Sequence, residues 1–242
     1  MFKIITIFTK KTISMKKAFT YLAAIFLIIT CNRIIAQNFK WAKQLGGGSC
    51  DGGSSIAIDE NENIYTTGHF YGTADFDPGA GTCYLTTAGY HDIFISKLDY
   101  NGNYVWAKKM GGESTDKGYS IVIDSQGNIY TVGIFCVTAD FDPDTSTYNL
   151  TSAGHTDIFI CKMDNNGSFI WAKQLGGGAY DYGYSMCVGI NGNIYITGSF
   201  EGTADFDPGD GTYNLTSNGY NDIFICKLNT SGSFMWAKQL GG

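Results

Sequence analysis

Beyond residue 36 the chain consists of short runs in which apolar and polar positions alternate. Alternation with a period of two is typical of strands, and no sustained helical period of about 3.6 residues appears there. The runs are also rich in Ile, Val, Thr, Tyr and Phe, which favour strands. In the first part of the chain they cover residues 55–59, 63–70, 92–98 and 104–110. The pattern therefore predicts an all-β protein.

Two kinds of connection separate these runs. Residues 124–128 (DSQGN) and 164–168 (DNNGS) place an Asp where its carboxylate can cap a turn and a Gly where a positive φ is required. Both are predicted to be tight hairpin turns. The third connection is much longer and runs through residues 73–91 in its first occurrence. It is predicted to be a prominent loop with room for one further short strand.

The same pattern returns with a fixed period of 65 residues, marked by the phrase WAKQLGG or WAKKMGG at Trp41, Trp106, Trp171 and Trp236. Three copies align without a gap and are identical in 29 of 65 columns. They span residues 41–105, 106–170 and 171–235, followed by a partial fourth copy at 236–242. A single four-stranded sheet cannot bury both of its faces, so the copies are predicted to stack on one another.

Two runs resemble a known family: IVIDSQGNIYTVG at 121–133 and DIFICKMDNNGSFIWAKQLGG at 157–177, both with counterparts in the other copies. They resemble the SBBP repeat, a β-propeller repeat of secreted and surface-associated bacterial proteins. The resemblance covers residues 37–242 and implies one propeller blade per repeat, without an enzymatic motif. Closed propellers have about four to eight blades. Three repeats therefore predict an open or partial propeller, completed by further blades or by self-association through exposed edge strands.

The first 36 residues differ from the rest, since they hold six basic and no acidic residues and an apolar run from 18 to 30. This run is too short to span a bilayer and suits a secretory signal peptide. The two lysines ahead of it favour Met15 as the start of translation, and Ala36 provides a cleavage site. We predict a mature domain of residues 37–242, without a transmembrane segment, that is secreted or associated with the cell surface or outer membrane. Lipid attachment at Cys31 is the alternative.

Removal of this leader leaves ten basic and 22 acidic residues, a net charge of −12. Such a surface repels phosphate backbones and attracts cations, which argues against a nucleic-acid partner.

The segment TADFDP is identical in all three copies and carries paired carboxylates. Asp-x-Asp in a loop with glycine can supply the oxygen ligands that Ca²⁺ takes, so calcium is the one cofactor considered. The alternative is that these aspartates cap turns through hydrogen bonds, which is the commoner role of a loop Asp. The candidate ligands are Asp75, Asp77, Asp140, Asp142, Asp144, Asp205 and Asp207.

Tyr90, His155 and Tyr220 precede the third strand of each unit in a polar stretch, where they are candidate contacts to a sugar ring or a partner protein. Paired carboxylates are also the working groups of glycosidases. The three pairs are equivalent, however, and no asymmetric acid–base or nucleophile constellation stands out. The sequence therefore predicts a non-enzymatic module for binding or scaffolding, with protein or glycan partners at the cell surface. The alternative is a fragment of a carbohydrate-acting propeller enzyme.

Overall fold

The computed structural model describes residues 39–241, so the signal peptide predicted for residues 1–36 lies outside this range. From Trp41 onward the chain forms one compact unit built of antiparallel strands. The predicted all-β fold is confirmed. Within residues 39–241 the structure holds no helix with the length and hydropathy needed to cross a membrane.

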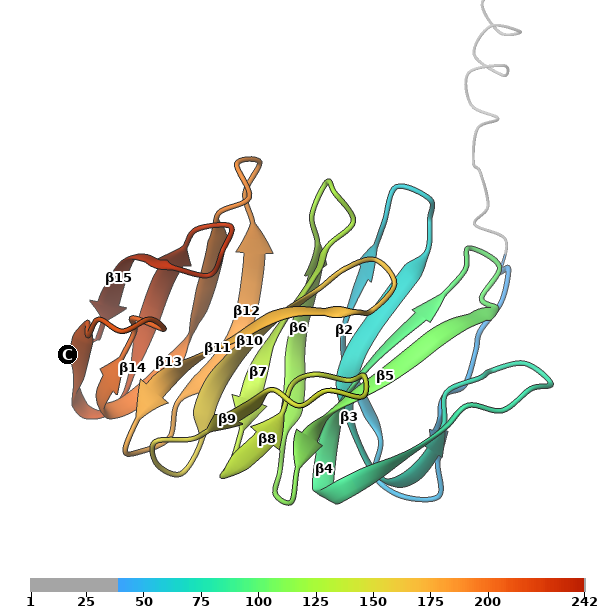
Figure 1. The fold of residues 1–242 in the computed structure, drawn as a ribbon, viewed down its shortest axis with the longest axis horizontal. Helices are drawn as coiled ribbons and strands as arrows, with labels where there is room; N and C mark the ends of the chain where they lie inside the picture. Colours follow the sequence, from blue (N-terminus) through green and yellow to red (C-terminus); the bar gives the residue numbers. More distant parts are fainter. Residues whose placement is uncertain (1–38, 242) are drawn as a thin grey trace, which may run out of the picture. The chain divides into compact units, whose positions relative to one another are not determined.

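Each repeat gives one four-stranded blade, and we number the blades 1 to 3 in chain order (Figure 1). Blade 1 contains β2 (Gly52–Ile58), β3 (Ile64–Asp75), β4 (Tyr84–Leu98) and β5 (Tyr104–Gly112). Blade 2 contains β6 (Lys117–Ile123), β7 (Ile129–Phe135), β10 (Asp157–Met163) and β11 (Phe169–Gly177). Blade 3 contains β12 (Tyr182–Val188), β13 (Ile194–Asp205), β14 (Asn214–Leu228) and β15 (Phe234–Leu240). Each blade takes its last strand from the WAKQLGG phrase that opens the next sequence copy.

The long third connection is not a loop with one short strand, as predicted, but a two-stranded hairpin that extends the sheet. In blade 1 β3 and β4 pair as far as Asp75 and Tyr84, and the hydroxyls of Thr73 and Thr86 lie 2.9 Å apart across the hairpin. In blade 2 the same hairpin forms the separate strands β8 (Thr138–Asp140) and β9 (Asn149–Thr151). The strand is interrupted there at Val137, whose φ is 61° and whose counterparts in the other blades are glycines.

The hairpins tie neighbouring blades together. Gly111 and Gly112 at the end of β5 pair with Asp140 and Ala139 of blade 2. The end of β11 pairs in the same register with blade 3, and β1 (Gly46–Gly47) pairs in the same register with blade 1. Over residues 39–241 the strands form two open sheets that do not close into a ring, which confirms the predicted open or partial propeller.

A triad of buried phenylalanines holds the turn end of each hairpin against its blade. In blade 2 the ring centroids of Phe135 and Phe141 are 5.4 Å apart, and those of Phe141 and Phe159 are 4.9 Å apart. The same triad recurs at Phe70, Phe76 and Phe94 and at Phe200, Phe206 and Phe224. Edge-to-face and tilted aromatic contacts of this kind add to the burial energy, so the hairpins are anchored extensions of the blades.

Candidate functional site

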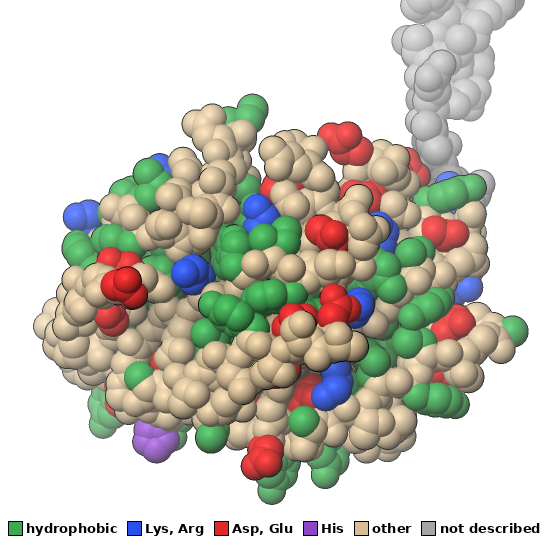
Figure 2. Space-filling model, viewed as in Figure 1, with side chains coloured by type: hydrophobic (Ala, Val, Ile, Leu, Met, Phe, Trp, Pro, Cys, Tyr) green, Lys and Arg blue, Asp and Glu red, His purple; other side chains and the backbone are tan. Residues whose placement is uncertain are grey.

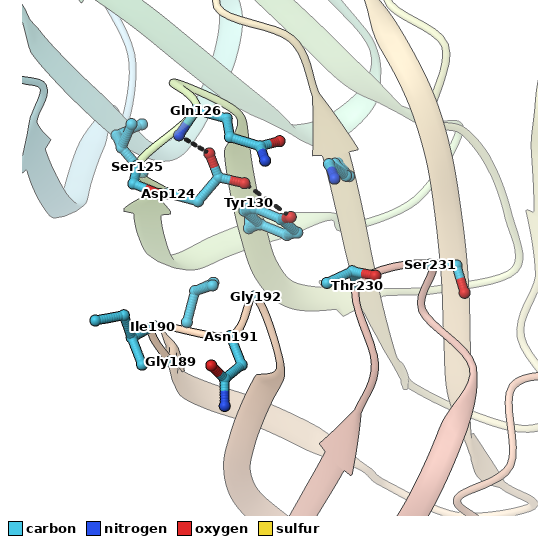
Figure 3. Close-up of a pocket in the computed structure, with 13 residues that line it drawn as sticks. Asp124, Ser125, Gln126, Tyr130, Gly189, Ile190, Asn191, Gly192, Thr230 and Ser231 are labelled. Atoms are coloured by element: carbon cyan, nitrogen blue, oxygen red, sulfur yellow. Dashed lines mark hydrogen bonds between the residues drawn. The ribbon is translucent and has the colours of Figure 1, made fainter.

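A groove of about 650 Å³ opens between the ends of blades 2 and 3 (Figure 3). Residues 123–126 form one wall, residues 188–192 of the β12–β13 turn form the facing wall, and Thr230 and Ser231 close the far side. Tyr130 and Lys162 complete the lining. The volume is in the range of sites that take small ligands.

Asp124 is the acidic side chain that lines this groove, and its oxygens are fully engaged. Oδ1 accepts hydrogen bonds from the backbone N–H groups of Gln126 and Asn128, both at 2.9 Å. Oδ2 accepts from the Asn128 amide at 2.8 Å. It also accepts from the Tyr130 hydroxyl at 3.1 Å, as Figure 3 shows. Burial raises the pKa of the Asp124 carboxyl, but these hydrogen bonds outweigh it and hold the pKa below its ordinary value. The turn predicted at residues 124–128 is confirmed, with Gly127 at a φ of 82°.

Lys162 is the cationic side chain of the groove, and it is held by aromatic rings. Its Nζ lies 4.9 Å from the centroid of the Tyr130 ring, and Tyr130 in turn makes an edge contact with Trp171 at 6.2 Å. The same lysine–tyrosine stack occurs in the other blades at Lys97 and Lys227. A lysine over a tyrosine face gains electrostatic attraction, so the stack is part of the architecture of every blade.

Two residues of the groove differ in chemical character from their counterparts in the other blades. Gly189 stands where the other two blades have the capping aspartates Asp59 and Asp124. Ile190, next to it, is fully exposed at the rim. Between blades 1 and 2, Lys97 Nζ donates to the backbone oxygen of Asn165 at 3.2 Å and bridges the two blades. The equivalent residues between blades 2 and 3, Lys162 and Thr230, both line the groove.

The lining combines uncharged hydrogen-bonding groups with apolar edges. Ser125, Gln126 and Asn191 supply hydroxyl and amide groups from two facing turns (Figure 3). Ile123, Val188 and Ile190 supply apolar contact. Such a surface can bind a neutral polyhydroxyl compound, because hydroxyls pair with amides while the C–H face of the ligand covers the aliphatic side chains.

The aspartates of the TADFDP segments cap the ends of their hairpins. Asp140 Oδ1 accepts from the backbone N–H groups of Asp142 and Tyr148 at 3.0 and 2.8 Å, and Asp75 and Asp205 repeat this arrangement. The second aspartate of each pair accepts from the backbone N–H two residues later. Asp144 is paired with Lys108 at 2.6 Å. The hydrogen bonds from Cys83 and Asp77 lower the pKa of Asp75.

These contacts agree with the turn-capping role. Among residues 39–241 no group of three or more His, Cys, Asp or Glu side chains is arranged to hold a metal ion. Calcium binding at the hairpins stays a prediction, and calorimetric titration with millimolar calcium that gives no heat would contradict it.

Comparison with known families decides the identity of the repeat. The model of the SBBP family, described as a β-propeller repeat, matches residues 40–69, 105–133 and 170–199. The chain is an SBBP β-propeller repeat protein. The second and third matches begin at the last strand of one blade, β5 or β11, and end in the second strand of the next blade. The first match begins at the equivalent N-terminal segment and ends in β3. The family motif therefore spans the junction between two blades.

Two curated proteins are similar in sequence to part or most of this chain. The uncharacterized WD repeat-containing protein L264 of Acanthamoeba polyphaga mimivirus is 28% identical over an alignment of 227 positions, which covers 83% of this chain and 16% of that protein. The regulatory protein FlaEY of Caulobacter vibrioides is 25% identical over an alignment of 127 positions, which covers 51% of this chain and 13% of that protein. The chain thus spans less than a fifth of either relative.

Among solved structures, a protein of unknown function from Bacteroides caccae aligns with 82% of this chain and 94% of its own length, at 9% identity and a TM-score of 0.30.

The three aromatic positions predicted as ligand contacts lie apart from the groove. Tyr90 and Tyr220 are exposed but belong to strands β4 and β14 rather than to a loop, because the hairpin extends these strands. Tyr90 lies against Tyr71, with ring centroids 6.4 Å apart. His155 stacks on Tyr180 at 4.7 Å. Their role as partner contacts stays a prediction.

Sequence reasoning missed a second carboxylate pair, which is buried at each junction between SBBP blades. Asp92 and Asp116 meet at the first junction, and Asp157 and Asp181 meet at the second; all four are fully buried. A glycine, Gly111 or Gly176, lies between the two carboxylates of each pair. Atoms of both carboxylates lie within 3.0 Å of the position that a Cβ on this glycine would take. The signal was available, since both columns are Asp in all three copies.

Proposed function

We propose that this SBBP repeat protein is a non-catalytic binding module that takes a glycan in the groove between blades 2 and 3. The engagement of Asp124 carries the proposal. Its two oxygens accept four hydrogen bonds from the turn and from Tyr130 of the adjoining strand β7, so the carboxylate has no free proton or lone pair to offer a reacting bond. Glycoside hydrolysis needs two carboxyl groups that face the scissile bond. The groove lining contains one.

Apart from Asp124 and Lys162, which carry opposite charges, the lining is uncharged, and this favours a neutral glycan over a polyanion. The acidic excess of residues 37–242 also opposes binding of an acidic chain. Figure 2 shows charged side chains of both signs scattered among uncharged and apolar ones on one face of the molecule. A surface of this kind offers no concentrated field that would select a charged partner.

The groove residue Ile190 gives the sharpest test of glycan binding. We expect Ile190→Asp to weaken binding of a glycan found on an array by about tenfold, because the charge removes apolar contact and must be desolvated against the ligand. Ile190 is fully exposed, so the fold should be unaffected. Affinity is measured by calorimetry with the array ligand.

Glu60 provides the matched control, since it holds the equivalent exposed position of blade 1. Glu60→Ala should bind like the parent chain. Equal affinity of Ile190→Asp and the parent would contradict the assignment of the groove. Turnover of the glycan that is lost in Asp124→Asn would instead favour a carbohydrate-acting enzyme.

We propose further that the module works outside the cytoplasm, at the cell surface or released from it. The support is the basic, apolar segment at residues 1–36, which has the composition of a secretory leader. N-terminal sequencing of the exported chain should begin at Gln37. A lipid-modified Cys31 would replace cleavage after Ala36 by membrane anchoring, and recovery in the cytoplasm with an intact leader would contradict export.

A further inference from the structure

The two junctions between blades bury the same side chains. At the first junction Ile93 and Met110 of blade 1 share a core cluster with Ile121 of blade 2. At the second junction Ile158 and Leu175 of blade 2 share a cluster with Met186 of blade 3. Every one of these side chains is at most 6% exposed. The junction is therefore a repeated apolar interface. The first strand of each following blade, β6 or β12, packs against the first three strands of the blade before it.

The two end blades present the halves of this interface uncovered. On blade 3, Ile223 and Leu240 are 53% and 52% exposed, whereas their counterparts Ile158 and Leu175 are buried. On blade 1, Ile56 is 64% exposed, whereas its counterpart Ile121 is buried. Because the sequence copies are similar, the exposed face of blade 3 is complementary to the exposed face of blade 1. The same complementarity joins the facing surfaces of blades 2 and 3.

Each of these end faces is hollowed. On blade 1 a cavity of about 300 Å³ is lined by Ile56, Ile64 and Thr66 together with Trp41 and Leu45 of the N-terminal segment. On blade 3 a cavity of about 300 Å³ is lined by residues that include Tyr195, Thr197 and Ile225. At the internal junctions Tyr130 and Val132, the counterparts of Tyr195 and Thr197, are buried.

Residues 41–47 already stand on blade 1 in the place of a preceding blade's last strand. Gly46 and Gly47 pair with Asp75 and Ala74 in the register that Gly111 and Gly112 adopt on blade 2. A Cβ on Gly102 would lie 3.1 Å from the Trp41 ring. Gly167 and Gly232 are equally close to Trp106 and Trp171, the last-strand tryptophans of the preceding blades. Blade 1 is thus shaped to receive another blade.

We propose that a second copy of this chain supplies that blade, with blade 3 of one copy packing head to tail against blade 1 of the other. Both halves of the interface are on every copy, and the interface continues the one that joins the internal blades. The contact is heterologous, so two copies close on each other if the rotation permits, and otherwise add further copies. Asp222 of one copy would meet Asp51 of the other as the third buried pair.

Each junction between copies requires one strand exchange. The WAKQLGG phrases at 41–47 and 236–242 are identical and would occupy the same slot between the two copies. β15 pairs with β14 through six residue pairs, whereas β1 pairs with β3 through two. The N-terminal segment of the receiving copy therefore leaves, and the end of β15 in the other copy takes its place.

Analytical ultracentrifugation of the chain without residues 1–36 tests the proposal. The parent chain should sediment as two or more copies, and Ile56→Asp and Ile223→Asp should each sediment as a monomer with an unchanged circular dichroism spectrum. An equimolar mixture of the two variants restores one intact junction, so it should form a complex of two copies and no larger species. Gly47→Ala should tighten association, because its Cβ would approach the Thr73 backbone oxygen and expel β1.

Gly48→Ala is the matched control, since nothing lies within 4 Å of its Cβ position. A parent chain that is monomeric at its highest soluble concentration would overturn the proposal and assign the end faces to blades of a longer chain. Association that persists in either single variant would overturn it as well. The inference is independent of glycan binding, because the groove lies between blades 2 and 3; Ile190→Asp should associate like the parent.

Discussion

Gly133→Ala is expected to lower the free energy of unfolding by about 3 kcal/mol or more, a cost at the upper end of overpacking in a core. A Cβ at Gly133 would clash with the backbone oxygen of Lys117 and would lie 2.8 Å from the ring of Phe159. β7 is buried along its whole length, so neither neighbour can withdraw without moving the sheet. Urea unfolding followed by circular dichroism measures the change.

Gly178→Ala is the control for this substitution. Nothing lies within 4 Å of the Cβ position of Gly178, and the equivalent residue at the first junction is Glu113, so a side chain is tolerated there. The control should unfold within about 0.5 kcal/mol of the parent. If Gly133→Ala unfolded at the same denaturant concentration as Gly178→Ala, the close packing of β6 on β7 described above would be wrong.

Asp157→Asn is expected to stabilise the chain by about 2 kcal/mol at pH 8 and to lose this advantage at about pH 5. Asp157 Oδ2 accepts hydrogen bonds from the Ala153 N–H at 3.0 Å and from Gln174, while Oδ1 is buried without a partner in the described structure. An uncharged amide at position 157 would remove the repulsion between two buried negative charges.

The pH dependence follows from Asp181. Burial raises its pKa to about 7, and the negative charge of Asp157 adds to the rise. A carboxyl with a raised pKa contributes stability that is complete below its ordinary pKa of 3.8 and is lost as the pH increases through about 7. The parent chain should therefore lose stability between about pH 4 and pH 7, and the variant should lose less. Thermal melting across this range gives the comparison.

The first junction supplies the control. There Lys109 pairs with Asp92 at 2.9 Å, at the position that Gln174 holds in the second junction. Asp92→Asn would remove this ion pair, so it should gain less stability at pH 8 than Asp157→Asn. Equal gains at both junctions would show that the lysine has no influence on the buried pair, and a loss at both would contradict the proposed repulsion.

The blades could be predicted from the sequence because their buried strands carry the signal. Strands such as β7 and β10 are apolar and lie between repeated turns whose Asp and Gly have defined roles. The hairpin extension could not be predicted in the same way. From Tyr84 to His91 the residues of β4 alternate between exposed and half-buried positions, so no apolar period marks this part as a strand.

The candidate groove escaped prediction for a different reason. Its walls come from turns of two neighbouring blades, and their meeting depends on how the blades pack rather than on any local motif. Identical columns mark what the repeats share, whereas Gly189 and Ile190 differ from their counterparts. The junction aspartates were identical in all copies, but only the fold brings Asp157 next to Asp181.

The similarity of the blades also bears on how the chain folds. A strand of one copy can pair with the partner strand of another copy in the native register, because 29 of 65 columns do not distinguish them. Native pairing within a blade joins neighbouring segments, such as β6 with β7 across the turn at residues 124–128, and short loops close faster than long ones. Correct pairing therefore depends on how close the strands are along the chain rather than on chemical differences between them. A high protein concentration would favour exchange of strands between molecules over folding within one molecule.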